Sequence, residues 1–182
     1  MSYKRWLVTA VVLFVIGIII GTVTPADARV ARDLTFGLKE LSGILIPFSP
    51  LTAFIIFVKN VLAMLLSFMF SPILCLLPIF SLMLNGWLLG FVSEVAIEQE
   101  SLGYVLVGVL PHGIFELPAL IIAQAAALGA GTAVILAAFQ RGKRATLVHR
   151  LSQYVKYLVL AFILLLPAAI MEAFVTPLLL GR

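Results

Sequence analysis

The stretch LPHGIFELP at residues 110–118 decides how the fold of this chain is to be understood. It places His112 and Glu116 four residues apart, flanked by prolines, within a segment that is otherwise apolar from residue 103 to residue 139. Ionisable side chains at membrane depth are costly, and they normally face a bundle interior or a water-filled cavity, where they pair with another group. We therefore expect Glu116 to be the first candidate for a functional residue.

The composition indicates that lipid surrounds most of this chain. Hydrophobic residues make up 63% of its 182 residues and charged residues 11%, whereas roughly 25% of the residues of an average soluble domain are charged. The long runs are apolar on every side, while the strands of a membrane barrel would alternate apolar and polar positions. We therefore expect an all-α fold, a polytopic transmembrane helical bundle that forms a single integral membrane domain over residues 1–182.

The apolar runs predict about five spans of roughly 20 residues each. They cover residues 6–23, 50–70, 72–92, 103–139 and 154–174. The fourth run is too long for one simple crossing, because a helix of that length would reach roughly 55 Å against a hydrocarbon core of roughly 30 Å. Pro111 and Gly113 offer a break, so we expect a broken or re-entrant helix near Pro111, with a long helix starting at about Gly113.

The charged residues predict the orientation of the bundle. Lys4 and Arg5 precede the first span, and the connection between the fourth and fifth spans is basic. The connection between the third and fourth spans carries acidic residues and no basic one. The positive-inside rule then places the N-terminus in the cytoplasm, and five crossings place the C-terminus outside the cell membrane. This topology accounts for the sequence pI of about 9.5, so we expect no nucleic-acid partner.

Small residues predict the faces on which the helices pack. Gly17 and Gly21 form one GxxxG pattern, and Gly86 and Gly90 form another. Small residues let helices approach closely in lipid, where packing and hydrogen bonds drive association. From these faces we expect a homo-oligomer in addition to close packing within the chain.

A set of polar residues lies inside the predicted spans and is where chemistry could take place. Its members are Lys59, Asn60, Asn85, His112, Glu116, Gln124 and Glu172. The predicted topology places His112, Glu116 and Glu172 in the outer half of the membrane, so these three could converge on one intramembrane site. Lys59 has a stem long enough to reach a carboxylate.

Four roles for this set stay open at the level of sequence. The side chains could pair with each other and fix the arrangement of kinked helices. Glu116 and Glu172 could titrate or bind a cation in a small transporter or channel. His112, Glu116 and Glu172 could bind zinc, although the HExxH arrangement is absent. The set could also contact a partner membrane protein.

Catalysis finds no support in the sequence. No serine or cysteine lies in a GxSxG context, and no glycine-rich phosphate loop is present. The single cysteine, Cys75, lies in a predicted span and suits an apolar core position. We therefore expect a non-enzymatic protein with no catalytic residues and no cofactor, zinc being the one alternative.

At these residues the chain resembles the stage II sporulation protein M family. The resemblance rests on PHGIFELPA at residues 111–119 with the small-residue run that follows it, and on AAIMEAFVTP at residues 168–177. Asn60 and the Asn85-Gly86 pair fit the same pattern more loosely. The resemblance covers residues 49–177.

The resemblance implies an integral membrane protein without known catalytic chemistry. The sporulation member of the family acts during engulfment, in a membrane complex with two peptidoglycan-degrading partners that it helps to localise. For this chain the resemblance implies a scaffold or a subunit of a membrane complex.

Overall fold

The computed structural model describes residues 3–25, 48–99 and 102–179, with side chains for all of these except residues 98–99, 102–112 and 141. Within these ranges the chain is helical and contains no strand. The elements are α1 (Tyr3–Val23), α3 (Pro50–Met69), α4 (Leu76–Gln99), α5 (Leu102–Phe139), the 3₁₀ turn η1 (Arg141–Thr146), α6 (Leu147–Ile170), the π-helical turn η2 (Met171–Val175) and α7 (Thr176–Leu179). Five helices of the described residues are long and apolar enough to cross a membrane, which confirms the predicted all-α bundle.

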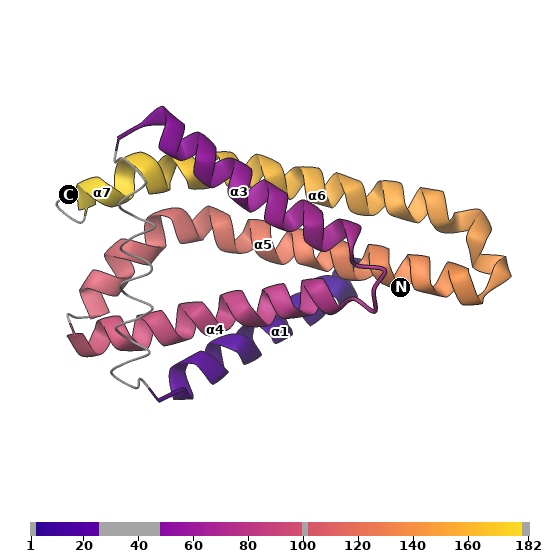
Figure 1. The fold of residues 1–182 in the computed structure, drawn as a ribbon, viewed down its shortest axis with the longest axis horizontal. Helices are drawn as coiled ribbons and strands as arrows, with labels where there is room; N and C mark the ends of the chain where they lie inside the picture. The colour runs from indigo at the N-terminus through magenta and orange to yellow at the C-terminus, as the bar shows by residue number, and fades with distance from the viewer. Residues whose placement is uncertain (1–2, 26–47, 100–101, 180–182) are drawn as a thin grey trace.

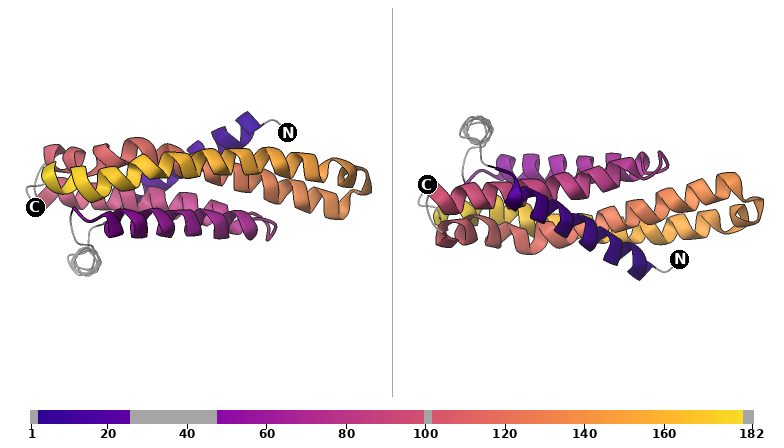
Figure 2. Two further views of the ribbon diagram at one scale, coloured as in Figure 1. Left: turned by 90° about the horizontal axis from the view of Figure 1, so that it is seen from above. Right: turned by 90° about the horizontal axis from the view of Figure 1, so that it is seen from below.

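Helix α5 occupies the centre of the bundle, with α3 and α6 on one side of it and α1 and α4 on the other (Figure 1). About two thirds of the residues in its spanning part are buried, against a third or fewer in the other spans. Its sequence explains this position, because the alanine-rich run of residues 123–130 lets neighbouring helices approach closely. The hairpin of α5 and α6 extends beyond the other helices at one end (Figures 1 and 2).

The interruption expected near Pro111 is a bend within a helix. Helix α5 continues through this residue, and its first part leads into the long spanning part, Gly113–Phe139, at an angle (Figure 1). Proline removes a backbone donor and displaces the preceding turn, and glycine beside it loosens the helix further. The bend, rather than a re-entrant loop, therefore resolves the excess length of this segment.

Two further boundaries differ from the predicted ones. The third span begins at Leu76 rather than at residue 72, because Leu74 and Cys75 adopt positive φ angles of 51° and 56° in the turn between α3 and α4. The fifth begins at Leu147, well before residue 154, and its regular α-helix ends at Ile170. Hydropathy locates the apolar part of a helix but does not locate the turns that start and stop it.

Helices α1 and α4 pack backbone against backbone through the four glycines of the two GxxxG patterns. A methyl group added at Gly17 would lie 2.5 Å from the carbonyl oxygen of Met83, and one added at Gly86 would collide with the carbonyl oxygen of Phe14. The glycine faces are thus used within one chain. The homo-oligomer expected from them stays a prediction. Because these glycines already pack α1 against α4, its interface would have to be formed by other residues.

Several basic residues gather at one end of the bundle. The start of α1, with Lys4 and Arg5, lies toward the end that carries the α5–α6 hairpin, whereas the chain ends at the opposite side (Figure 1). Lys143, Arg144 and Arg150 belong to the same hairpin end. This arrangement agrees with an odd number of crossings, and the cytoplasmic location of the basic end stays a prediction.

We predict that a cysteine introduced at Ala145, an exposed position in η1, is not labelled from outside intact cells by a membrane-impermeant maleimide. Labelling should appear once the membrane is permeabilised, because the positive-inside rule places this hairpin in the cytoplasm. The unmodified chain, whose Cys75 is buried, is the control for background reaction. Labelling of Ala145→Cys in intact cells would reverse the topology.

Candidate functional site

Gln124 lies at the centre of the bundle and connects three helices. Its side chain, only 1% exposed, projects from α5. Its Oε1 accepts a hydrogen bond from Ser67 Oγ of α3 at 2.5 Å, and its Nε2 donates one to Ser81 Oγ of α4 at 3.0 Å. Both ends of the amide are therefore satisfied by side chains from other helices, which is what a polar group buried in an apolar bundle requires.

A second polar pair joins α3 to α5 two helical turns away. Asn60 Nδ2 donates a hydrogen bond to Glu116 Oε1 at 3.2 Å, in a partly buried position. The two helices run in the same direction (Figure 1), and two turns of a helix take about seven residues. The spacings of 60 to 67 on one helix and 116 to 124 on the other therefore place both pairs on one interface. We call Asn60, Ser67, Ser81, Glu116 and Gln124 the polar seam.

The contact between the two helices continues to the turn after α3. Cys75 Sγ lies 3.7 Å from the carbonyl oxygen of Leu128 and 3.7 Å from Thr132 Oγ1. A methyl group at Gly131 would collide with the carbonyl group of Ser71. Cys75 thus lies in the connection between two spans, which corrects its expected place inside a span, and it is buried against α5 as predicted.

Lys59 and Asn85 lie within the predicted spans but do not join the seam. Each has an exposed side chain. Lys59 is turned by about 100° around α3 relative to Asn60, and this rotation takes it off the face that meets α5. Asn85 donates to the carbonyl oxygen of Ser81 in its own helix at 2.8 Å, so its amide is satisfied locally.

Glu172 lies in the π-helical turn η2 and is partly buried. This turn contacts both α3 and α5, and the Ala173 carbonyl oxygen accepts a hydrogen bond from the Phe48 backbone N–H at 3.1 Å. Pro177 has no backbone N–H to donate to the Ala173 carbonyl oxygen, which lies four residues before it in the sequence. π-Helical turns are frequent at functional sites, so Glu172 remains a candidate residue.

The convergence of His112, Glu116 and Glu172 stays a prediction. The His112 side chain lies outside the described part of the chain. Among the side chains that are described, no group of three His, Cys, Asp or Glu residues is placed to hold a metal ion. Because the proposed zinc site includes His112, whose side chain is not described, the zinc site stays a hypothesis.

Ser67 and Ser81 are the seam residues whose role sequence reasoning missed. Serine is common in membrane helices because its hydroxyl can bond to its own backbone, so a single serine gives little signal. The available signal was the spacing. Ser67 follows Asn60, and Gln124 follows Glu116, by nearly the same number of turns, which indicates two helices in parallel contact.

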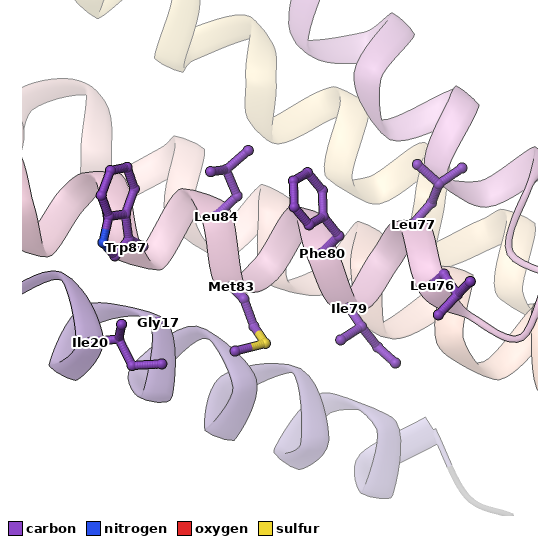
Figure 3. A pocket seen from close by; sticks show the side chains of 9 residues that line it. All are labelled: Gly17, Ile20, Leu76, Leu77, Ile79, Phe80, Met83, Leu84 and Trp87. Atoms are coloured by element: carbon purple, nitrogen blue, oxygen red, sulfur yellow. The ribbon is translucent and has the colours of Figure 1, made fainter. Parts of the chain in front are cut away.

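An apolar groove between α1 and α4 carries no candidate chemistry. It has a volume of about 640 Å³ and is lined by aliphatic, aromatic and methionine side chains together with Gly17. Figure 3 shows Met83 and Ile20 in the space between the two helices and Trp87 along α4. The Trp87 indole N–H is already bonded to Thr24 Oγ1 at 3.1 Å. The groove therefore offers an apolar lining only, and the candidate site is the polar seam together with Glu172.

The comparisons with known proteins identify the family of this chain. The family model for stage II sporulation protein M matches residues 10–177, which includes the whole seam and η2. The chain belongs to the stage II sporulation protein M family. It is also similar to the uncharacterized protein MJ0793 of Methanocaldococcus jannaschii, with 26% identity over 98 residues. That match covers 53% of this chain and 55% of the relative, so the chain spans about half the length of the curated relative. No solved structure matches.

Family membership identifies this chain as a membrane protein of that family. The properties of the candidate site are inferred from the positions of its residues in the structure. The matched region begins within α1 and ends just after η2. This member of the family is therefore a multi-pass membrane protein whose central polar residues link helices to each other.

We predict that Gln124→Leu lowers the free energy of unfolding by about 1–2 kcal/mol, because two hydrogen bonds between helices are lost. Thermal unfolding of the purified protein in mild detergent would measure the change. Gln140→Leu, at an exposed position after α5, is the control and should change stability by less than about 0.5 kcal/mol. Equal effects of the two substitutions would contradict a stabilising role for the seam.

Proposed function

We propose that this protein is a non-enzymatic subunit of a membrane complex, a scaffold whose exposed face on α3 binds a partner membrane protein. The observation that carries the proposal is the exposed position of Lys59 in the middle of α3. No described residue pairs with its ammonium group. A lysine at the centre of a membrane helix costs about 2.5–3.5 kcal/mol, so a partner with an acidic group at that depth would relieve the cost.

The neighbours of Lys59 form a stripe that suits helix packing. Ile55, Leu62, Leu66 and Met69 are exposed by 43%, 52%, 52% and 68%, respectively. Together with Lys59 they are spaced alternately by four and three residues, which is the pattern of a helix that packs along another helix. A membrane helix with an aspartate or glutamate opposite Lys59 is therefore the occupant that the stripe fits.

The polar seam supports the scaffold role in a different way. The amide of Gln124 uses both of its ends on serines of the same chain, which holds α3 and α4 against α5. A rigidly held α3 presents its outer stripe in a fixed orientation. Family membership adds to this proposal, because the resemblance implies a member that works in a membrane complex.

We predict that a photo-crosslinking residue at Leu62 captures one partner membrane protein in cells. The cross-linked peptide should come from a transmembrane segment that contains an aspartate or glutamate, and Lys59→Gln should reduce its yield several-fold. The same residue at Val12, exposed by 49% on α1, is the control and should not capture that partner. Capture of a second copy of this chain at Leu62, or a yield unaffected by Lys59→Gln, would reject the proposed partner.

A transporter or channel is the second candidate, and the position of Glu116 favours it. This carboxyl group lies just after the bend of α5, and the π-helical turn that carries Glu172 contacts the same helix. Bends and π-helical turns expose backbone carbonyl groups that can bind a cation. Proton or cation transfer would then depend on the charge of Glu116.

We predict that liposomes containing the purified protein show no proton or sodium flux above that of protein-free liposomes, as a scaffold requires. In this case Glu116→Gln should leave stability nearly unchanged, because the amide can still accept a hydrogen bond from Asn60. Flux that is present in the unmodified protein and lost in Glu116→Gln, with thermal stability retained, would establish the transporter instead. Asn85→Asp, at an exposed position on α4, is the control for a change of charge elsewhere.

A further inference from the structure

A second cavity lies at the basic end of the bundle, between the start of α1 and the first turns of α6. Its volume is about 570 Å³. The side chains that give it its character are Tyr3, Lys4, His149, Arg150, Tyr154 and Tyr157. Unlike the groove between α1 and α4, it combines cationic groups, hydroxyl groups and aromatic rings in one space.

The aromatic side chains of this cavity contact each other and helix α5. The rings of Tyr3 and Tyr157 stack with their centroids 3.5 Å apart and their planes 2° from parallel. The Tyr3 hydroxyl donates to the Ile122 carbonyl oxygen of α5 at 3.0 Å. Tyr154 is 7% exposed, and its ring packs so closely on Gly129 that a methyl group added there would collide with the ring. The cavity is therefore built into the junction of α1, α5 and α6.

The positive charge in the cavity is not neutralised by the described residues. The lining contains no acidic side chain, and no described carboxylate pairs with Lys4 or Arg150. Arg150 also lines an adjoining cavity of about 150 Å³, together with Lys143 and Tyr154. Arg150 is thus partly buried between two spaces with its hydrogen-bonding groups available to a ligand.

Arg144 differs from Lys4 and Arg150 because its hydrogen bonds are made within the bundle. Its guanidinium group donates to the carbonyl oxygens of Ala137 and Ala138 at 3.0 and 3.4 Å. These carbonyl groups belong to the last turn of α5, where a cation is favoured. Lys4 and Arg150 have no such internal acceptor among the described residues.

We propose that this cavity binds a phosphate group, carried either by the headgroup of an anionic phospholipid or by a soluble molecule. Arginine binds phosphate oxygens in pairs, and lysine adds a point charge. The cavity lies where α1 begins, at the end of a span, which is the level of lipid headgroups. Tyrosine is favoured at this level, and basic pockets between membrane helices on the cytoplasmic side bind anionic headgroups.

The experiment measures ligand retention by the full-length protein with native mass spectrometry in mild detergent. Phosphatidylglycerol is titrated in one arm, phosphatidylcholine in a second, and glycerol phosphate in a third, the last both alone and as a competitor. We expect the unmodified protein to retain phosphatidylglycerol in preference to phosphatidylcholine. Replacing both Lys4 and Arg150 by glutamine should weaken that binding by about tenfold to thirtyfold, since each basic residue near a membrane surface contributes about one kcal/mol.

A matched control separates the site from general attraction between charges. Lys156→Gln removes a charge from the exposed side of α6, outside the cavity lining, and should leave binding unchanged. Retention of phosphatidylglycerol that glycerol phosphate does not displace would identify a lipid ligand. Binding and competition by glycerol phosphate would identify a soluble one, and both results would support recognition of phosphate.

Two results would overturn the proposal. One is that the Lys4→Gln, Arg150→Gln double variant retains phosphatidylglycerol and glycerol phosphate as well as the unmodified protein does. The other is an equal loss of binding in Lys156→Gln. Circular dichroism establishes that the double variant is folded, and Lys4→Gln alone, at an exposed residue, provides the same test with a smaller expected effect if it is not.

Discussion

The buried amide of Gln124 is the interaction on which the rest of the bundle depends. Hydrocarbon cannot satisfy a polar group, so an amide at the centre of the membrane has to find its partners on other helices. Gln124 finds them on Ser67 and Ser81, and this choice fixes the rotation of α3 and α4 about their axes. Once these rotations are set, Asn60 faces Glu116 and Cys75 faces α5 without further requirements.

Close packing of small residues also holds the helices together. The alanine-rich face of α5 leaves room for α6, and Gly129 in particular leaves room for the ring of Tyr154. Helix α1 is attached mainly through α4, where two pairs of glycines bring the backbones together. The polar seam thus orients the helices near α5, whereas α1 is positioned by the glycine faces and, at its start, by the contacts of Tyr3 with Ile122 and Tyr157. A polar contact specifies a rotation, and a glycine face permits a close approach but specifies less.

Sequence reasoning predicted the fold class, the five spans and an interruption near Pro111, because hydropathy and proline act locally and leave a direct pattern, but it did not predict that the interruption is a bend within one helix. It also selected Glu116 and Asn60 as residues inside the bundle. It did not show that the side chains of Lys59 and Asn85 are exposed, since a residue within an apolar span can face either the bundle or its surroundings, and hydropathy does not give the direction. The spacing of polar residues indicates part of the pairing between α3 and α5. The position of Ser81, in contrast, depends on where α4 begins, and the turn before α4 is formed by Leu74 and Cys75 with their positive φ angles.

The polar side chains of this protein fall into three groups, according to whether they point into the bundle, away from it, or into the cavity at the basic end. Side chains that meet each other inside, as Gln124 and Ser67 do, stabilise the bundle and have little capacity left for a ligand. Lys59, on the outside of α3, is unsatisfied by the described residues, and a partner could supply the acidic group that it lacks there. At the basic end Lys4 and Arg150 line a cavity that contains stacked tyrosine rings, and none of its described lining side chains is acidic. Binding energy is available where the fold leaves a charge without an internal partner, so the periphery of this bundle, more than its centre, is where recognition is to be sought.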